Sequence, residues 1–171
     1  MATQFERIEP PLARFIAKQK IFFAATATGD SRINLSPRST DALRSIVHSL
    51  LCYLDLTGSG SETSAHLLAD GRMTLMFCAF EGPPMILRLY GRARSLFHGT
   101  PEYAERLAAS YDGEAPLGAR QIVELTADLV QTSCGYAVPL FEHQGERDVL
   151  TRWAEGKGAE GLKAYRAEKN A

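Results

Sequence analysis

The stretch Leu50–Phe80 reads LLCYLDLTGSGSETSAHLLADGRMTLMFCAF. It begins with an apolar run, Leu50–Leu56, whose length and composition predict a buried β-strand. The residues from Glu62 to about Asp70 are typical of a short helix. The apolar run Met73–Phe80 then predicts a second strand. The stretch therefore predicts a strand, a turn, a helix and another strand in succession.

The turn between the first strand and the helix, Thr57–Ser64, carries two glycines and five hydroxyl side chains. The start of a helix presents unpaired backbone N–H groups and the positive end of the peptide dipoles, so it suits an anion such as a phosphate. Ser61 could instead be a simple N-cap, with the glycines forming the turn. Because one cap residue is enough to start a helix, the excess of hydroxyls favours an anion site.

Strand pairs are predicted on both sides of this stretch. Before it, Ile21–Ala27 and Ile33–Ser36 are β-rich runs separated by the turn pair Gly29-Asp30, and they predict a hairpin. Pro37 cannot donate a ladder hydrogen bond, so it places the second of these strands at an edge or a bulge. After it, the turn Glu81–Pro84 joins Met73–Phe80 to a strand over Met85–Ser95.

Helices and one further strand complete the pattern. A helix is predicted to start at Pro10, and another at Pro101, where Thr100 is a favourable N-cap. Ile122–Ala127 predicts a strand that could continue to Ser133, and a charged helical tail begins at about Asp148.

Gly91 lies inside the predicted strand Met85–Ser95, where a glycine indicates a bend or bulge that curves a sheet. Hairpins with curving glycines, and helices set to one side, predict an α+β fold built on a small antiparallel β-barrel. No linker or repeat divides residues 1–171, so we expect a single domain.

The composition gives no reason to expect a nucleic-acid or membrane partner. The formal net charge is −1, and no apolar run approaches the roughly 20 residues that span a bilayer. Cys52, Cys78 and Cys134 are odd in number and far apart, which argues against a disulfide framework. We therefore expect a cytoplasmic protein with reduced thiols.

Several catalytic motifs are excluded. Gly58–Thr63 lacks the lysine of a P-loop, and hairpin connections do not fit a dinucleotide-binding Rossmann fold. No Gly-x-Ser-x-Gly elbow is present, and the histidines and cysteines lack zinc-ligand spacing. We expect no metal site.

Two arginines allow two interpretations each. Arg38, at the end of a strand, could hold a phosphate or lie beside a flavin ring, or it could be a solvated loop residue. Arg88 interrupts an apolar strand, so it is either paired inside the barrel or facing a ligand cleft.

The segment Thr132–Pro139 is a second unusual cluster. Cys134 could be a nucleophile only if a neighbouring base or helix start lowered its pKa, and a small packing residue is the more ordinary reading. Tyr136 could stack on a planar ligand or belong to the core.

Taken together, the segments Ala25–Thr28, Ile33–Arg38, Tyr53–Thr63, Arg72–Phe77, Leu87–Gly91 and Thr132–Tyr136 resemble the pyridoxamine 5′-phosphate oxidase-like flavoproteins. The resemblance implies a split β-barrel that forms a homodimer, with FMN bound in clefts at the dimer interface. It also implies that the strand carrying Ser36 lies along the flavin, and that the turn Thr57–Thr63 holds the ring edge and the phosphate. The implied cofactor contacts are Ser36, Arg38, Ser39, Thr57, Gly58, Ser59, Ser61, Thr63, Arg88, Cys134 and Tyr136.

One position departs from the oxidase itself. The oxidase has an Arg-Lys pair at this helix start, where this sequence has Glu62 and Thr63. The resemblance thus implies a relative of the oxidase, an FMN-dependent oxidoreductase acting on a small organic substrate. The alternatives are a deazaflavin-dependent reductase on the same fold, and a non-enzymatic flavin- or haem-binding carrier or sensor.

Overall fold

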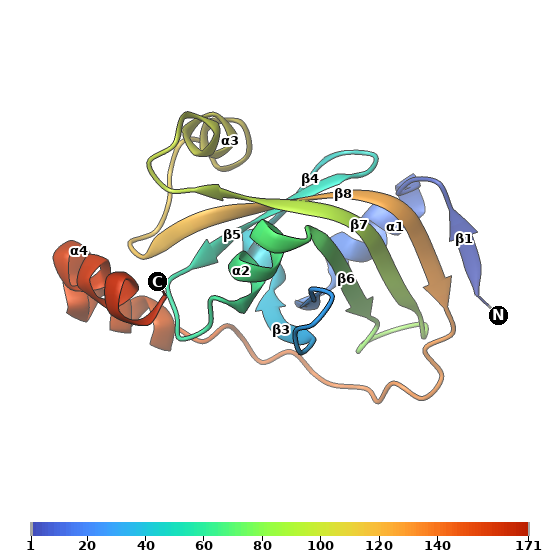
Figure 1. Ribbon diagram of the computed structural model, residues 1–171. Coiled ribbons are helices and arrows are strands. Elements are labelled where there is room, and N and C mark those ends of the chain that lie inside the picture. The colour runs from blue at the N-terminus through green and yellow to red at the C-terminus, as the bar shows by residue number, and fades with distance from the viewer. Residues whose placement is uncertain (1, 171) are drawn as a thin grey trace.

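The computed structural model describes residues 2–170 of the chain and consists of one strongly curled sheet with helices around it (Figure 1). The strands are β1 Thr3–Phe5, β2 Ile21–Thr26, β3 Asn34–Ser39, β4 Leu43–Val47, β5 Leu50–Leu56, β6 Arg72–Cys78, β7 Ile86–Phe97 and β8 Ala119–Ser133. The helices are α1 Pro10–Lys18, α2 Glu62–Ala69, α3 Pro101–Tyr111 and α4 Val149–Lys169, with a 3₁₀ turn η1 at Thr40–Ala42.

The sheet has eight strands in the order β3-β2-β6-β7-β8-β5-β4, with β1 added beside β8. Every pairing is antiparallel. The path has two ends, β3 and β4, so the curled sheet forms a half-barrel rather than a closed cylinder. This confirms the predicted α+β split barrel.

Both predicted hairpins form. β2 pairs with β3, and Ala24 lies opposite Ser36; β6 pairs with β7, and Leu75 lies opposite Leu89. β3 is an end strand of the sheet, which explains how Pro37 is tolerated in it. The predicted edge position of that proline is confirmed.

The predicted bulge at Gly91 is also present. The register between β7 and β8 shifts between Tyr90 and Gly91. A Cβ atom on Gly91 would lie 2.0 Å from the backbone oxygen of Thr126, so only glycine allows β8 to approach this closely. The bulge lies where the long strands β7 and β8 bend, and it contributes to the curl of the sheet.

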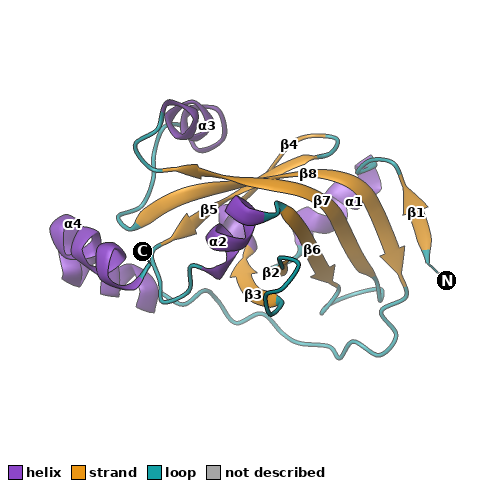
Figure 2. Ribbon diagram, in the orientation of Figure 1, coloured by secondary structure: helices purple, strands orange, loops and turns teal. Residues whose placement is uncertain are grey.

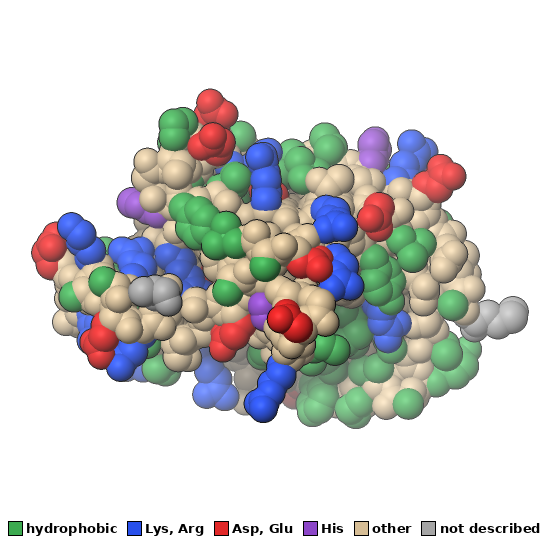
Figure 3. Space-filling view, in the orientation of Figure 1, with side chains coloured by type: hydrophobic (Ala, Val, Ile, Leu, Met, Phe, Trp, Pro, Cys, Tyr) green, Lys and Arg blue, Asp and Glu red, His purple; other side chains and the backbone are tan. Residues whose placement is uncertain are grey.

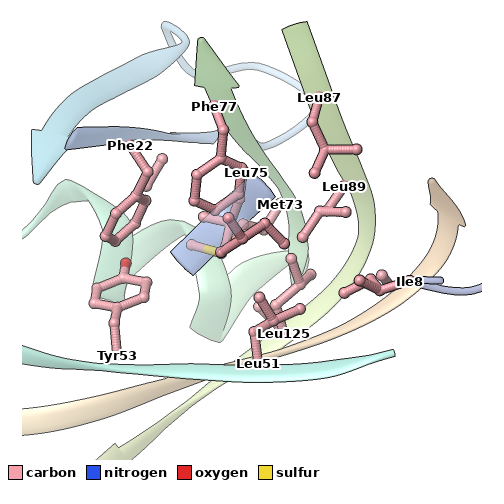
Figure 4. Close-up of a cluster of buried hydrophobic side chains, with 14 of the residues drawn as sticks. Ile8, Phe22, Leu51, Tyr53, Met73, Leu75, Phe77, Leu87, Leu89 and Leu125 are labelled. Atoms are coloured by element: carbon pink, nitrogen blue, oxygen red, sulfur yellow. The ribbon is translucent and has the colours of Figure 1, made fainter. Parts of the chain in front are cut away.

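The main core fills the concave side of the curl (Figure 4). Alternate residues of the strands point inward: Phe22, Leu75, Leu87 and Leu89 are fully buried. The Phe22 ring meets Tyr53 edge-on at 5.4 Å between centroids. α1 and α2 close this core with Leu12, Ile16 and Leu67. Burying each large side chain stabilises the fold by about 1.5–3 kcal/mol, so this cluster is the main source of stability.

A second, smaller core lies between the sheet and α3 and includes Leu54, Leu96, Tyr103 and Ile122. Thr100 caps α3 by accepting a hydrogen bond from the Tyr103 amide at 3.3 Å, as its position before Pro101 predicts. A long segment, residues 134–148, then runs as a loop from the end of β8 to α4 (Figure 2). We call this segment the strap.

The C-terminal helix α4 forms where the sequence predicts a helical tail, and Gly158 interrupts it. It is more than a surface tail, because Ala154 and Leu162 are buried.

β1 and β4 are not predicted by the sequence pattern. No helix in residues 2–170 is long and apolar enough to cross a membrane.

Candidate functional site

The edge strand β3 and the start of α2 are joined by a chain of polar contacts. The Asn34 side-chain amide donates to the Thr63 hydroxyl oxygen at 2.9 Å and to the Thr26 hydroxyl oxygen at 3.3 Å. The Ser36 hydroxyl donates to the Asn34 side-chain oxygen at 3.2 Å. Thr26 Oγ1 and His66 Nδ1 lie 3.1 Å apart, which extends the chain along α2. Two of the predicted contacts, Ser36 and Thr63, are thereby brought together.

The turn between β5 and α2 is held in place by hydrogen bonds to residues near the start of β8 and the end of α4. Thr57 is 1% exposed, and its hydroxyl donates to the Gly118 carbonyl at 2.8 Å. The Asn170 side chain donates to the Gly58 carbonyl at 3.3 Å. Arg120 Nη2 donates to the Gly60 carbonyl at 2.6 Å. The Thr57 hydroxyl therefore fixes the turn, and the carbonyls of the two glycines point toward the protein.

Ser59 and Ser61 have hydroxyls that remain available. Ser61 is the N-cap of α2, with φ −125° and ψ 7°, and its side chain makes no capping hydrogen bond. Ser59 is exposed at the tip of the turn. Together with the backbone N–H groups of the first turn of α2, these hydroxyls are donors free to meet an anion.

Arg38 is drawn into the barrel by a buried carboxylate. Asp55 is fully buried and pairs with both Arg38 and Arg120, whose Nε lies 2.9 Å from Asp55 Oδ2. Gln121 Nε2 donates to the same carboxylate oxygen at 2.7 Å. The Arg38 guanidinium also lies over the Tyr53 ring, 5.1 Å from its centroid. Burial raises the pKa of Tyr53 far above its ordinary value.

The remaining predicted contacts are spread more widely. Ser39 caps η1 by accepting a hydrogen bond from the Asp41 amide at 3.2 Å. Arg88 is on the outer face of the sheet, opposite in parity to the buried Leu87 and Leu89, and donates to the Ser133 hydroxyl at 3.1 Å. It is therefore not paired inside the barrel.

Cys134 and Tyr136 begin the strap. Cys134 is an exposed free thiol, and Tyr136 is 83% exposed, so neither belongs to the core. Between them, Gly135 lies against Met85: a Cβ atom there would be 2.9 Å from the Met85 backbone nitrogen. The close approach fixes this end of the strap beside the start of β7.

An open cleft of about 1390 Å³ lies between α1, the end of β3, the β6–β7 turn and the strap. Arg38 and Ser39 line it at the β3 end. The other predicted contacts are not among its lining residues. The candidate site thus has two parts, the β3–α2 corner and this adjoining cleft.

Residues 8–134 match the family model described as pyridoxamine 5′-phosphate oxidase. The chain belongs to this family. A pyridoxamine 5′-phosphate oxidase family protein of Aspergillus flavus, ustO, is 34% identical over 144 residues. The match covers 81% of this chain and 56% of that protein, so the chain spans little more than half of its relative's length.

Solved structures show the same fold at low sequence identity. A HupZ variant from Group A Streptococcus superposes with a TM-score of 0.58 at 17% identity, covering 74% of this chain and 99% of that one. HutZ, the heme storage protein from Vibrio cholerae, gives 0.51 at 16% identity, with 76% and 98% covered. A pyridoxamine 5′-phosphate oxidase-related FMN binding protein from Nostoc punctiforme gives 0.50 at 11% identity, with 74% and 80% covered.

FMN is the cofactor that the resemblance to the pyridoxamine 5′-phosphate oxidase family implies, and the corner offers groups that suit it. Ser59, Ser61 and the first N–H groups of α2 can meet a phosphate. Glu62 opposes it: its carboxylate folds over Gly60, where an added Cβ would lie 2.7 Å from Glu62 Oε2. Because Glu62 is exposed, its side chain can swing away, and the donors of the corner then suit the phosphate of the cofactor.

The sequence pattern did not identify the residues whose hydrogen bonds and ion pairs hold the corner together. Asn34, Asp55, Arg120 and Asn170 are not among the predicted contacts, yet they connect β3, the turn and the end of α4. One signal was available for Asp55, since a carboxylate inside the apolar run Leu50–Leu56 must be paired if it is buried.

Proposed function

We propose that this chain binds FMN at the β3–α2 corner as a homodimer and acts as an oxidoreductase on a small organic substrate. The observation that supports this most directly is the Asn34–Thr63 hydrogen bond of 2.9 Å. It brings the strand that would lie along a flavin against the helix start that would receive its phosphate. The FMN-binding relative from Nostoc punctiforme with the same fold is consistent with this role.

Each group has a part in the proposed site. The hydroxyls of Ser59 and Ser61, with the N–H groups of the first turn of α2, would hold the phosphate. Arg38, fixed by Asp55, would place a positive charge at the far end of β3, beside the ring. FMN, when bound, supplies the hydride and electron transfer chemistry, while the protein orients the substrate and excludes water.

The outer face of the sheet supports the homodimer. Phe23, Met76 and Arg88 lie opposite one another across β2, β6 and β7, on the face away from the core, and each is partly exposed. Leu35, on the edge strand β3, is 60% exposed. Hydrophobic side chains gather over β6 and β7 in the space-filling view (Figure 3). A partly apolar surface of this kind suits burial against a second copy.

The absorption spectrum of the purified protein and a titration with FMN test the proposal. We expect the two visible flavin bands and quenching of FMN fluorescence on binding. A Soret band would instead indicate a haem carrier, and binding of a deazaflavin but not of FMN would indicate the other reductase. Oxidation of a reduced nicotinamide would then separate an enzyme from a carrier or sensor.

A double variant, Ser59→Ala with Ser61→Ala, tests the position of the phosphate. Each lost hydrogen bond should weaken FMN binding by about 0.5–1.5 kcal/mol. The exposed Ser45 on β4 provides a control, because Ser45→Ala removes a hydroxyl far along the sheet from α2. Equal FMN affinity in the double variant and the control would place the phosphate elsewhere.

A further inference from the structure

Four unpaired cations line the cleft beside β3. Arg14 and Lys18 are one helical turn apart on α1, so they lie on one face of it, and Lys20 follows the end of the helix. Arg147 faces the cleft from the strap. All four are exposed, and none forms an ion pair with any residue in the described range 2–170.

Three carboxylates line the same cleft. Glu81 Oε1 accepts a hydrogen bond from the His143 amide at 3.3 Å. Glu146 Oε1 lies 3.1 Å from Nε2 of the same histidine. Glu142 is the third carboxylate of the lining. The four unpaired cations therefore outnumber the three carboxylates of the lining, and the formal charge of the cleft is positive.

The cleft also offers an apolar aromatic surface. Phe80 and Phe141 meet edge-on with their ring centroids 5.4 Å apart, and the Phe141 amide donates to the Phe80 carbonyl at 3.0 Å. Phe141 nevertheless remains 60% exposed. Phe15, Pro84 and Met85 add further apolar contacts from α1 and the β6–β7 turn.

We propose that this cleft binds an organic anion: a molecule with a flat apolar body and a carboxylate or phosphate group. The body lies against Phe80 and Phe141, and the anionic group is held by Arg14 and Lys18. Charge-assisted hydrogen bonds to these side chains supply much of the affinity, and the rings orient the ligand. Small-molecule sites combine an apolar lining with a few directed polar groups in this way.

The position of the cleft suggests a use for such a ligand. It adjoins β3 at Pro37, Arg38 and Ser39, the end of the strand along which the flavin is proposed to lie. An anion bound there would be next to the flavin ring, which is the place that a substrate must occupy. This assignment as substrate rests on the proposed function, whereas binding of the anion does not.

Calorimetric titration with 2-naphthoate tests the proposal, with the neutral 2-naphthamide as a matched probe. We expect the carboxylate to bind at least about 10-fold more tightly than the amide, with an affinity that falls as salt is added. The double variant Arg14→Gln with Lys18→Gln should lose that difference. Both side chains are exposed, so the variant should fold, and circular dichroism verifies this.

The control is a double variant on α4, Lys163→Gln with Lys169→Gln, which removes two exposed charges outside the cleft. It should bind 2-naphthoate as the unaltered protein does. Equal binding of the amide and the carboxylate, or full binding by the α1 variant, would overturn the proposal. So would inorganic phosphate that competes as strongly as 2-naphthoate, because the aromatic surface would then contribute nothing.

The same titration with and without FMN separates the two proposals. Binding of 2-naphthoate by a protein that fails to bind FMN would support the anion site and remove the flavin function. Binding of FMN without any specific binding of 2-naphthoate would do the reverse.

Discussion

Asn34 on β3 and Thr63 on α2 are 29 residues apart in sequence, and a 2.9 Å hydrogen bond joins their side chains. Thr63 is 3% exposed, whereas Asn34 is half-buried, so the bond is shielded from water on the helix side. It ties the edge strand of the half-barrel, which has a sheet neighbour on one side only, to the helix that follows the glycine-rich turn. The proposed flavin corner depends on this connection.

Replacing Thr63 with valine should loosen the corner. Valine has nearly the same shape but cannot accept the hydrogen bond from Asn34, so unfolding should cost about 0.5–1.5 kcal/mol less. FMN should also bind more weakly, because β3 is no longer held against α2. Urea unfolding and an FMN titration measure the two effects. Thr126→Val on β8, where the side chain is exposed, is the control. Stability and affinity equal to those of the control would show that the bond has no role.

Replacing Glu62 with glutamine should strengthen FMN binding. A carboxylate about 4 Å from a phosphate costs about 1 kcal/mol in water, so removing its charge should improve affinity up to about fivefold. Riboflavin, which lacks the phosphate, should bind both proteins equally and is the matched ligand. Glu114→Gln, in the exposed loop before β8, controls for the loss of charge. A glutamine variant that binds FMN no better would mean that α2 does not face the phosphate.

Replacing Asp55 with asparagine should be among the most damaging changes in the chain. The carboxylate is fully buried between Arg38 and Arg120, which keep 23% and 11% of their side-chain surface exposed. Without it, two largely buried guanidinium groups lose their counter-charge, and breaking such a pair typically costs about 3–5 kcal/mol. Asp128→Asn, on an exposed position of β8, should change the unfolding free energy by less than about 0.5 kcal/mol. Denaturant unfolding of both variants decides the matter.

Alanine at Gly91 should disrupt the bend of β7. Its Cβ would lie 2.0 Å from the Thr126 oxygen and 2.9 Å from the Ala127 Cα, and both are backbone atoms of β8. Overpacking of this kind typically costs about 1–3 kcal/mol, and more where the backbone must move. Gly29→Ala, where nothing lies within 4 Å of the added atom, should be close to neutral. A thermal melt that does not distinguish the two variants would contradict the bulge.

Alkaline solution should destabilise the fold through its buried tyrosines. Burial raises the pKa of Tyr53 and of Tyr111 well above the ordinary value of about 10. The unfolded chain therefore loses these protons first as the pH rises. Their contribution to stability is fully present below about pH 10 and is lost progressively above it. Urea midpoints between pH 8 and pH 11 should fall, and less steeply in Tyr53→Phe. Tyr136→Phe, at an exposed position, should leave the slope as it is.

Most of the regular structure could be predicted because it is specified locally. Alternating residues around the turns at Gly29 and Pro83 predict the hairpins, and the Thr100-Pro101 pair predicts the start of α3. Gly91 predicts the bulge because the clash of a side chain with a neighbouring strand is a property of that one position. β1 escaped prediction because three residues are too few to show a period.

The candidate site was likewise predicted only in part from the sequence. The hydroxyl-rich turn before α2 was predicted from the residues themselves, because turn and cap residues act on their immediate neighbours. The place of Ser36 in the site was implied only by the resemblance to the family. The fold alone decided three other features of the site. Arg38 turns inward to Asp55, and Arg120 and Asn170 hold the turn. Arg14 and Lys18 face the strap across a cleft. These contacts join residues far apart in the chain. They form only after the sheet has curled, so the local sequence pattern cannot predict them.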